Sequence, residues 1–317
     1  MRGVTFDDEY APEDWVGSTT TVFGESRAGL SVLPDGRLLR NAVAADPKGF
    51  LGAAHVHRYG ADPALLVKLL DAAERLPVHC HPDRGFAREH LGMRHGKTEG
   101  WLIVEARGAN PSVHLGFREE ADAETLAGWV ERQERERLLE ALHELPVAPG
   151  DWVFVPAGLP HAIGEGVFLV ELQEPSDLSV LLEWAGFAID GTRDGHLGLG
   201  FDVALRSVTL ARVGTDELAA LLGSPTDGPE LRPGARRLLP PQADPYFRAE
   251  GLRPDPIVSL GPDFSILVLL EGHGSLETEH GGTLELCRGE TVLVPHAAGA
   301  AELTGTVEAI RCLPPPS

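Results

Sequence analysis

Residues Ala148–Ile163 read APGDWVFVPAGLPHAI, and a related pattern returns at Cys287–Leu303 as CRGETVLVPHAAGAAEL. Each copy has a glycine and an acidic residue, then alternating apolar residues, then a proline. This order is typical of a turn followed by a β-strand that a proline terminates. Gly150 and Gly289 lie 139 positions apart, and the two prolines keep the same spacing. The repeat predicts two related β domains, and the alternative is a chance likeness between common β turns.

Other segments between residues 1 and 210 have the short alternating pattern of strands. We expect strands at Leu65–Leu70, Leu76–His81, Thr98–Ala106, Ser112–Phe117, Asp151–Val155 and Gly166–Gln173.

Two segments have the spacing of helices instead. Ala121–Leu145 has apolar residues at helical spacing with charges between them, which predicts one or two amphipathic helices inserted at about residues 119–146. A further helix is expected at Asp216–Leu222, before a linker rich in proline and glycine. Short strands then follow from about Tyr246 to the end of the sequence.

Composition excludes several classes of partner. The net charge of −21 argues against a nucleic-acid partner, because a phosphate backbone requires clustered lysine and arginine. No apolar run approaches the roughly 20 residues of a membrane span. Three cysteines do not form a disulfide framework, and MRGVTFDDEYAPEDW lacks the apolar core of a signal peptide. We therefore expect a cytoplasmic protein without nucleic-acid or membrane partners, whose oligomeric state the sequence does not indicate.

The stretch LPVHCHPD, Leu76–Asp83, contains three side chains that bind transition metals. On a strand, successive side chains point to opposite faces, so His79 and His81 share one face and Cys80 points away. If the histidines bind a metal, the cysteine between them is not expected to do so.

Two further residues have the context of metal ligands. Glu99 opens a predicted strand in HGKTEGWLIVEA, and His161 follows the end of another in VPAGLPHAI. A shell of imidazoles and a carboxylate suits zinc, with iron(II) and manganese as competitors. A lone histidine on a strand is more often structural, but the combination favours a metal site.

Five segments carry a resemblance to a known family. LLVKLLDA, HCHPD, GKTE, PAGLPHAI and ELQEPSD follow one another in the order and spacing of the motifs of the type I mannose-6-phosphate isomerases, a zinc-dependent family of the cupin superfamily. EDWVGSTT, from Glu13, resembles the family's early W-x-x-S segment. The resemblance implies a mainly β protein with two cupin (jelly-roll β-barrel) domains and a short helical insertion. Residues 1–210 would form the catalytic, metal-binding cupin, and residues 211–317 a linker and a second, metal-free cupin.

The resemblance also implies a set of site residues. One zinc ion per chain would be held by His79, His81, Glu99 and His161, although the family usually has glutamine at the position of His79. Lys68 and Lys97 match family lysines near the substrate, and would contact its anionic or hydroxyl groups. In the second domain Ala300 stands where His161 stands in the first, 139 positions earlier, so no matching metal site is expected there.

The implied activity is the interconversion of mannose 6-phosphate and fructose 6-phosphate through an enediol. Zinc would act as a Lewis acid on the sugar oxygens, and Lys97 would add positive charge beside them. Glu171 is the first candidate for the base that moves the proton. The alternative for Glu171 is a buried carboxylate bonded to a neighbouring strand.

The family's active-site arginine has no direct match. The segment PSDLSVLLEWAGFAIDGTRDG contains no arginine before Arg193, which either substitutes from a displaced loop or is an exposed turn residue. An isomerase acting on another sugar, phosphorylated or not, and a non-catalytic sugar-binding cupin are therefore the alternative functions. An iron(II) cupin dioxygenase is disfavoured by the GKTE and PAGLPHAI motifs.

Overall fold

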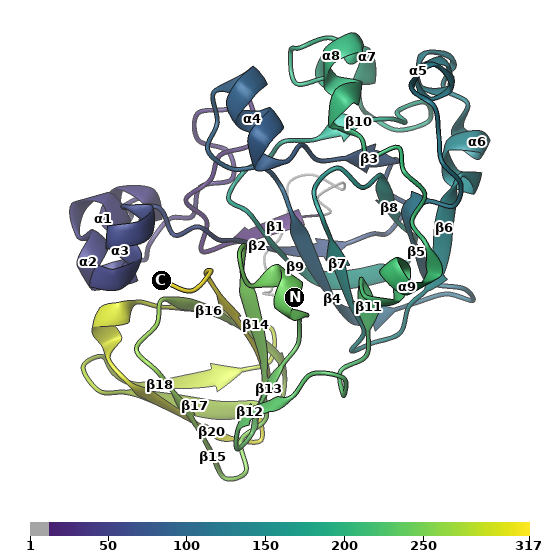
Figure 1. The fold of residues 1–317 in the computed structure, drawn as a ribbon. Helices are drawn as coiled ribbons and strands as arrows, with labels where there is room; N and C mark the ends of the chain where they lie inside the picture. The colour runs from purple at the N-terminus through teal and green to yellow at the C-terminus, as the bar shows by residue number, and fades with distance from the viewer. Residues whose placement is uncertain (1–12) are drawn as a thin grey trace. The chain divides into compact units, whose positions relative to one another are not determined.

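The computed structural model describes residues 13–317 and is mainly β (Figure 1). Most of the N-terminal stretch on which the absence of a signal peptide was predicted lies outside the described residues. Within residues 13–317, no helix combines the length and the apolarity that a bilayer span requires.

Contacts divide the chain into two units. The central unit consists of Leu70–Val170 and Ser176–Gly223, and the terminal unit consists of the described residues up to Leu69, Glu171–Pro175 and Ser224–Ser317. The early residues therefore group with the end of the chain, and the division falls within two strands. The predicted domain limits at 1–210 and 211–317 stay a prediction.

Two sheets contain the strands of the first barrel. One sheet has the order β10 (Val180–Leu181), β3 (His79–Cys80), β8 (His161–Ile163), β5 (Ser112–Phe117) and β6 (Leu142–Pro146). The other has the order β1 (Glu13–Val16), β2 (Leu66–Asp71), β9 (Val167–Gln173), β4 (Glu99–Ala106), β7 (Trp152–Val155) and β11 (Leu222–Gly223). The predicted strands are thus present, although the one expected at Leu76–His81 shortens to two residues.

The helical insertion of the central unit contains α5 (Ala123–Arg132) and α6 (Arg135–Glu140). Helix α5 begins where the Asp122 side chain accepts a hydrogen bond from the Thr125 amide, as an N-cap does. The expectation that the helical segment extends to Leu145 was wrong, because Leu142–Pro146 form β6 and pair with β5. That pairing satisfies the backbone groups of the segment, and tertiary context overrides its helical spacing.

The remaining helices of the central unit are short: α4 (Arg84–Leu91), α7 (Gly191–Asp194), α8 (Phe201–Ala204), η1 (Leu205–Ser207) and α9 (Thr215–Ala219). Helix α9 overlaps the helix expected at Asp216–Leu222 but ends at Ala219, and Leu222 belongs to β11. Helix α4 follows the HCHPD motif and was not predicted.

The terminal unit contains α1 (Leu39–Ala45), α2 (Pro47–Leu51) and α3 (Ala53–Tyr59), and a second set of strands drawn in green and yellow in Figure 1. One sheet has the order β12 (Glu230–Arg232), β13 (Ala235–Arg237), β14 (Arg248–Leu252), β21 (Glu308–Leu313), β16 (Ser265–Glu271) and β19 (Thr291–Val294). The other has the order β15 (Ile257–Leu260), β20 (Ala301–Gly305), β17 (His273–Thr278) and β18 (Gly282–Cys287). Two 3₁₀ turns, η2 (Pro241–Ala243) and η3 (His296–Ala298), connect strands.

The internal repeat is present in the structure as two equivalent strands. Strands β7 and β19 begin and end 139 positions apart, and each pairs antiparallel with a longer strand. Val155 of β7 lies opposite Glu99, and the matching Val294 of β19 lies opposite Ser265. Register therefore places Ser265 of the second barrel at the position that Glu99 occupies in the first.

Candidate metal centre

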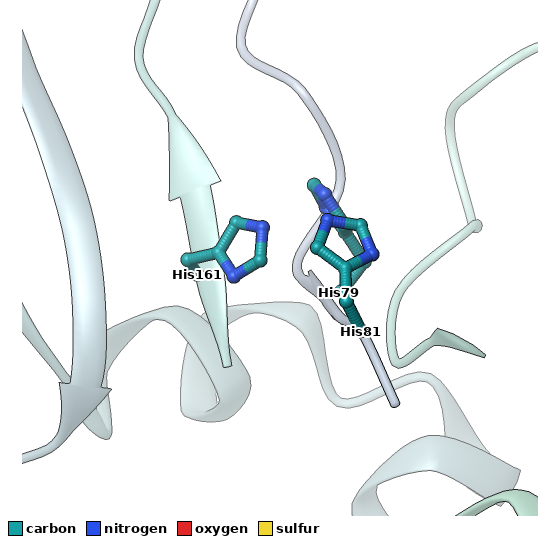
Figure 2. A group of neighbouring side chains, drawn as sticks. All are labelled: His79, His81 and His161. Atoms are coloured by element: carbon teal, nitrogen blue, oxygen red, sulfur yellow. The ribbon is translucent and has the colours of Figure 1, made fainter. Parts of the chain in front are cut away.

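The three histidines of the predicted site come together in the central unit. Strands β3 and β8 are antiparallel neighbours in which His79 lies opposite His161, and His81 follows β3 directly. The ring centroids lie 4.3 to 4.9 Å apart. One ligand nitrogen from each ring lies within 4.8 Å of the others, and Figure 2 shows the His161 ring facing the rings of His79 and His81.

Cys80 points away from this cluster, as strand alternation predicted. Its side chain is fully buried in an apolar cluster with neighbours such as Val78 and Val180, and its Sγ lies 3.8 Å from Ser207 Oγ. Burial raises the pKa of the Cys80 thiol to about 12, so the group stays a neutral thiol at physiological pH.

Main-chain carbonyl groups orient the three imidazole rings. Each Nδ1 lies 2.8 Å from a carbonyl oxygen, those of Pro77, Leu178 and Leu159 for His79, His81 and His161 respectively. A carbonyl oxygen only accepts hydrogen bonds, so each Nδ1 carries the proton and each Nε2 carries a lone pair. This is the arrangement in which protein histidines bind metals through Nε2.

The ring of His81 has one further neighbour. Ser179 Oγ lies 3.4 Å from its Nδ1, farther away than the Leu178 carbonyl. The shorter contact, to the Leu178 carbonyl, which only accepts hydrogen bonds, places the proton of the His81 ring on Nδ1.

Burial keeps these imidazoles neutral. It lowers the pKa of His79 and of His161 to about 3, and that of His81 to about 4. At neutral pH the three Nε2 lone pairs are therefore available to a cation.

Glu99 brings a carboxylate to the same place from the start of β4. Its Oε1 lies 2.9 Å from His81 Nε2 and 3.0 Å from Lys97 Nζ, and its Oε2 lies 3.7 Å from His161 Nε2. Burial alone would raise the pKa of Glu99, but the positive charge of Lys97 opposes it, and that pKa lies well below its ordinary value. Glu99 is therefore a carboxylate anion that faces the Nε2 lone pairs of His81 and His161.

Lys97 is the cation found beside these groups. Its Nζ lies 3.2 Å from His81 Nε2, and the side chain is almost fully buried. Strand alternation would place Lys97 and Glu99 on one face if the strand began at Lys97. In the structure β4 begins at Glu99, and the two side chains nevertheless meet.

The donor set fits a bound cation. A lone pair on His81 Nε2 faces a carboxylate oxygen at 2.9 Å, and the buried His161 Nε2 has no hydrogen-bond partner among the described residues. Buried acceptors that face one another are costly unless a positive charge lies between them. Three nitrogen ligands and a carboxylate match the ligand preferences of zinc, iron(II) and manganese.

Lys68 and Glu171 lie in the terminal unit, on β2 and β9. Lys68 Nζ is 3.7 Å from Glu171 Oε1 and 3.1 Å from Glu13 Oε2, and it lies 4.6 Å from the centre of the Trp15 ring. Lys68 and Glu171 are both buried. Their predicted roles, a substrate contact and a base, stay predictions.

Arg193 lies in α7 with 75% of its side chain exposed. Its Nε and Nη2 donate hydrogen bonds to the two carboxylate oxygens of Asp194 at 2.8 and 2.7 Å. Its predicted role in catalysis stays a prediction.

Sequence reasoning did not identify two side chains that support this cluster. Trp101 donates a hydrogen bond from Nε1 to Glu99 Oε2 at 3.1 Å, and Ser176 donates one from Oγ to the carbonyl of Gly96 at 2.6 Å. Strand alternation contains the signal for Trp101, which lies two residues after Glu99 and so on the same face. No local signal marks Ser176, because its partner lies 80 positions away.

Curated proteins with similar sequences share one name. A mannose-6-phosphate isomerase of Streptococcus mutans is 34% identical over 155 residues, which are 47% of this chain and 47% of that protein. The mannose-6-phosphate isomerase ManA of Bacillus subtilis is 31% identical over 188 residues, 57% of this chain and 53% of that protein. The matches thus span about half the length of these relatives. No protein-family model matches the chain.

Solved structures match over nearly the whole chain. The mannose 6-phosphate isomerase from Bacillus subtilis has a TM-score of 0.75 at 23% identity, over 98% of this chain and 92% of its own. A mannose 6-phosphate isomerase bound with zinc and yttrium has a TM-score of 0.69 at 19% identity, over 96% and 91% of the two chains. The predicted fold class, mainly β with jelly-roll cupin barrels and a short helical insertion, is confirmed. The resemblance to the type I mannose-6-phosphate isomerases is confirmed as well, and the chain is a relative of these proteins.

Proposed function

We propose that this chain is a zinc-dependent aldose–ketose isomerase that interconverts mannose 6-phosphate and fructose 6-phosphate. The observation that carries the proposal is the cluster of three imidazoles, two of which face the Glu99 carboxylate through Nε2, with Lys97 beside it. The similar mannose-6-phosphate isomerases of Streptococcus mutans and Bacillus subtilis indicate the substrate.

One zinc ion would be held by His79, His81, Glu99 and His161. Zinc bound there would act as a Lewis acid that draws electron density from the sugar oxygens on C1 and C2. The same donor set suits iron(II) and manganese, so metal analysis of the purified protein is part of the test.

The reaction moves one proton from C2 of the aldose to C1 of the ketose and shifts the carbonyl group in the opposite direction. In the proposal Glu171 takes the proton from C2, which leaves an enediolate. The hydroxyl proton on O2 passes to O1, and Glu171 then returns its proton to C1. Lys68 lies beside this carboxylate, with its Nζ 3.7 Å from Glu171 Oε1. Lys97 donates a hydrogen bond to the sugar oxygen on which negative charge develops.

Two further contacts belong to the proposal. Lys68 and Lys97 contact anionic or hydroxyl groups of the substrate, and Arg193 substitutes for the arginine that the family motif would place earlier in the sequence. The proposal also includes a cytoplasmic location, a small sugar phosphate as the partner, and no nucleic acid or membrane.

The experiment is a coupled assay for fructose 6-phosphate, run on protein of measured metal content with mannose 6-phosphate or free mannose as substrate. Turnover of mannose 6-phosphate that follows the zinc content supports the proposal. The engagement of Arg193 by Asp194 favours the alternative of an unphosphorylated sugar, which turnover of free mannose alone would establish. A zinc-loaded protein that turns over neither sugar would contradict an isomerase and favour a sugar-binding module.

A further inference from the structure

The two oxygens of the Glu99 carboxylate have different partners. Oε1 faces His81 Nε2 at 2.9 Å and Lys97 Nζ at 3.0 Å. Oε2 accepts a hydrogen bond from Trp101 Nε1 at 3.1 Å. The carboxylate is therefore held in one orientation, with one oxygen directed to the metal-binding nitrogens and the other to the indole.

Trp101 is fixed in turn by its surroundings. It is fully buried on β4, two residues after Glu99 and on the same face, opposite Val153 of β7. Its ring meets the His161 ring edge to face, with centroids 5.5 Å apart. An indole Nε1–H is a single donor that cannot accept, and a buried donor without an acceptor is costly. The position of the ring thus fixes the position of Oε2.

We infer that Trp101 is a positioning residue for the metal centre, which acts by holding Glu99 Oε2 so that Oε1 faces the bound ion. The inference rests on the proposed metal site but not on the identity of the sugar. Oε2 lies only 3.7 Å from His161 Nε2, so a carboxylate that lost its indole partner would be free to turn within the site. Groups that orient a ligand in this way typically contribute 10- to 100-fold to metal affinity.

The test measures zinc affinity by competition with a chromophoric chelator in Trp101→Phe, which keeps a buried aromatic ring and removes the donor. The expected result is a rise in the zinc Kd of about 10-fold or more. Trp152→Phe is the matched control, because Trp152 is a buried tryptophan of the adjacent strand β7 that faces the other side of the sheet. Its zinc Kd should equal that of the wild type.

A double-mutant cycle separates positioning from packing. If Trp101 acts through Glu99, then Trp101→Phe has no further effect on zinc Kd in a Glu99→Ala background. An equal loss in both backgrounds, or a wild-type Kd in Trp101→Phe, overturns the inference.

A second replacement covers the case in which Trp101→Phe does not fold. Incorporating benzothienylalanine at position 101 exchanges the indole N–H for sulfur and keeps the shape of the ring, and it is expected to raise the zinc Kd by the same factor. If this variant binds zinc as the wild type does, the inference is wrong. A wild-type chain that binds no divalent metal would instead overturn the proposed function together with the inference.

Discussion

The two barrels have equivalent strands, but the buried polar groups at the end of these strands have different partners. In the first barrel, the residue opposite the end of β7 is Glu99, which lies among imidazole lone pairs. In the second, the residue opposite the end of β19 is Ser265, whose Oγ accepts a hydrogen bond from Arg311 Nε at 3.2 Å. Arg311 also donates to the carbonyl of Gly261 and lies 3.6 Å from Glu250, which Arg232 binds through two nitrogens.

The partners of the buried groups distinguish a structural polar cluster from a binding site. Around Arg311, donors face acceptors and positive charges face a negative one, so the protein itself supplies the partners of these buried polar groups. Around His161, acceptors face one another. Lys97 lies beside Glu99 and His81, but His161 Nε2 has no hydrogen-bond partner among the described residues. One scaffold therefore carries a self-sufficient core in one copy and a candidate metal centre in the other.

The largest expected effect comes from His81→Ala. Structural zinc sites contribute about 10–16 kcal/mol, so losing one of four ligands costs about 3 kcal/mol or more, a fall in affinity of at least about 100-fold. Metal analysis after dialysis should find no stoichiometric zinc, and turnover should disappear. His280→Ala, an exposed histidine of the second barrel, is the control and should retain the metal. Stoichiometric zinc in His81→Ala would contradict the role of His81 as a metal ligand.

Glu171→Gln tests the proposed base. The amide cannot accept the proton from C2, so kcat should fall by about 100- to 10,000-fold. Zinc content should stay that of the wild type, because Glu171 is not a proposed ligand. A variant with wild-type kcat would exclude Glu171 as the base and leave the metal site unaffected.

Arg311→Met tests whether the polar cluster of the second barrel contributes to stability but not to zinc binding. It leaves Glu250 with Arg232 as its remaining close ion-pair partner among the described residues, and breaking a buried ion pair typically costs about 3 kcal/mol or more of unfolding free energy. Urea denaturation measures the loss, and chelator competition should show an unchanged zinc Kd. A stable Arg311→Met protein with weaker zinc binding would contradict the distinction between the two clusters.

The smallest effect is expected for Glu183→Gln. Glu183 is a second buried carboxylate of the central unit, and protein groups supply its hydrogen bonds. Burial alone would raise the pKa of Glu183, but hydrogen bonds from Arg75, Arg135 and the Val78 amide lower it below its ordinary value. Because the folded pKa is lowered, the stabilisation is present above the unfolded pKa of about 4.3 and is lost as the pH falls through the folded value.

The variant should therefore be about 2 kcal/mol less stable than the wild type at pH 7, the scale of a hydrogen bond to a charged group. Thermal unfolding followed between pH 7 and pH 3 should show the two proteins converging in acid. A difference that stays constant over this range would mean that the charge of Glu183 does not contribute.

Local sequence patterns predicted part of the candidate site. Alternation placed His79 and His81 on one face and Cys80 on the other, because the side-chain period of a strand is two. The same period contains the information that Trp101 and Glu99 share a face. By contrast, the helical spacing that extended to Leu145 was misleading, because pairing with β5 decided the conformation of that segment.

The sequence by itself determined the repeat, most of the strands and the identity of four groups that can bind a metal. Only the tertiary structure decided that these groups meet, because the pairing of β3 with β8 joins His79 to His161 across the intervening chain. It also decided that each Nδ1 finds a carbonyl oxygen and each Nε2 keeps its lone pair. The physical reason is one of range: side-chain direction along a strand is a local property, whereas register and hydrogen-bond partners depend on residues that are distant in sequence.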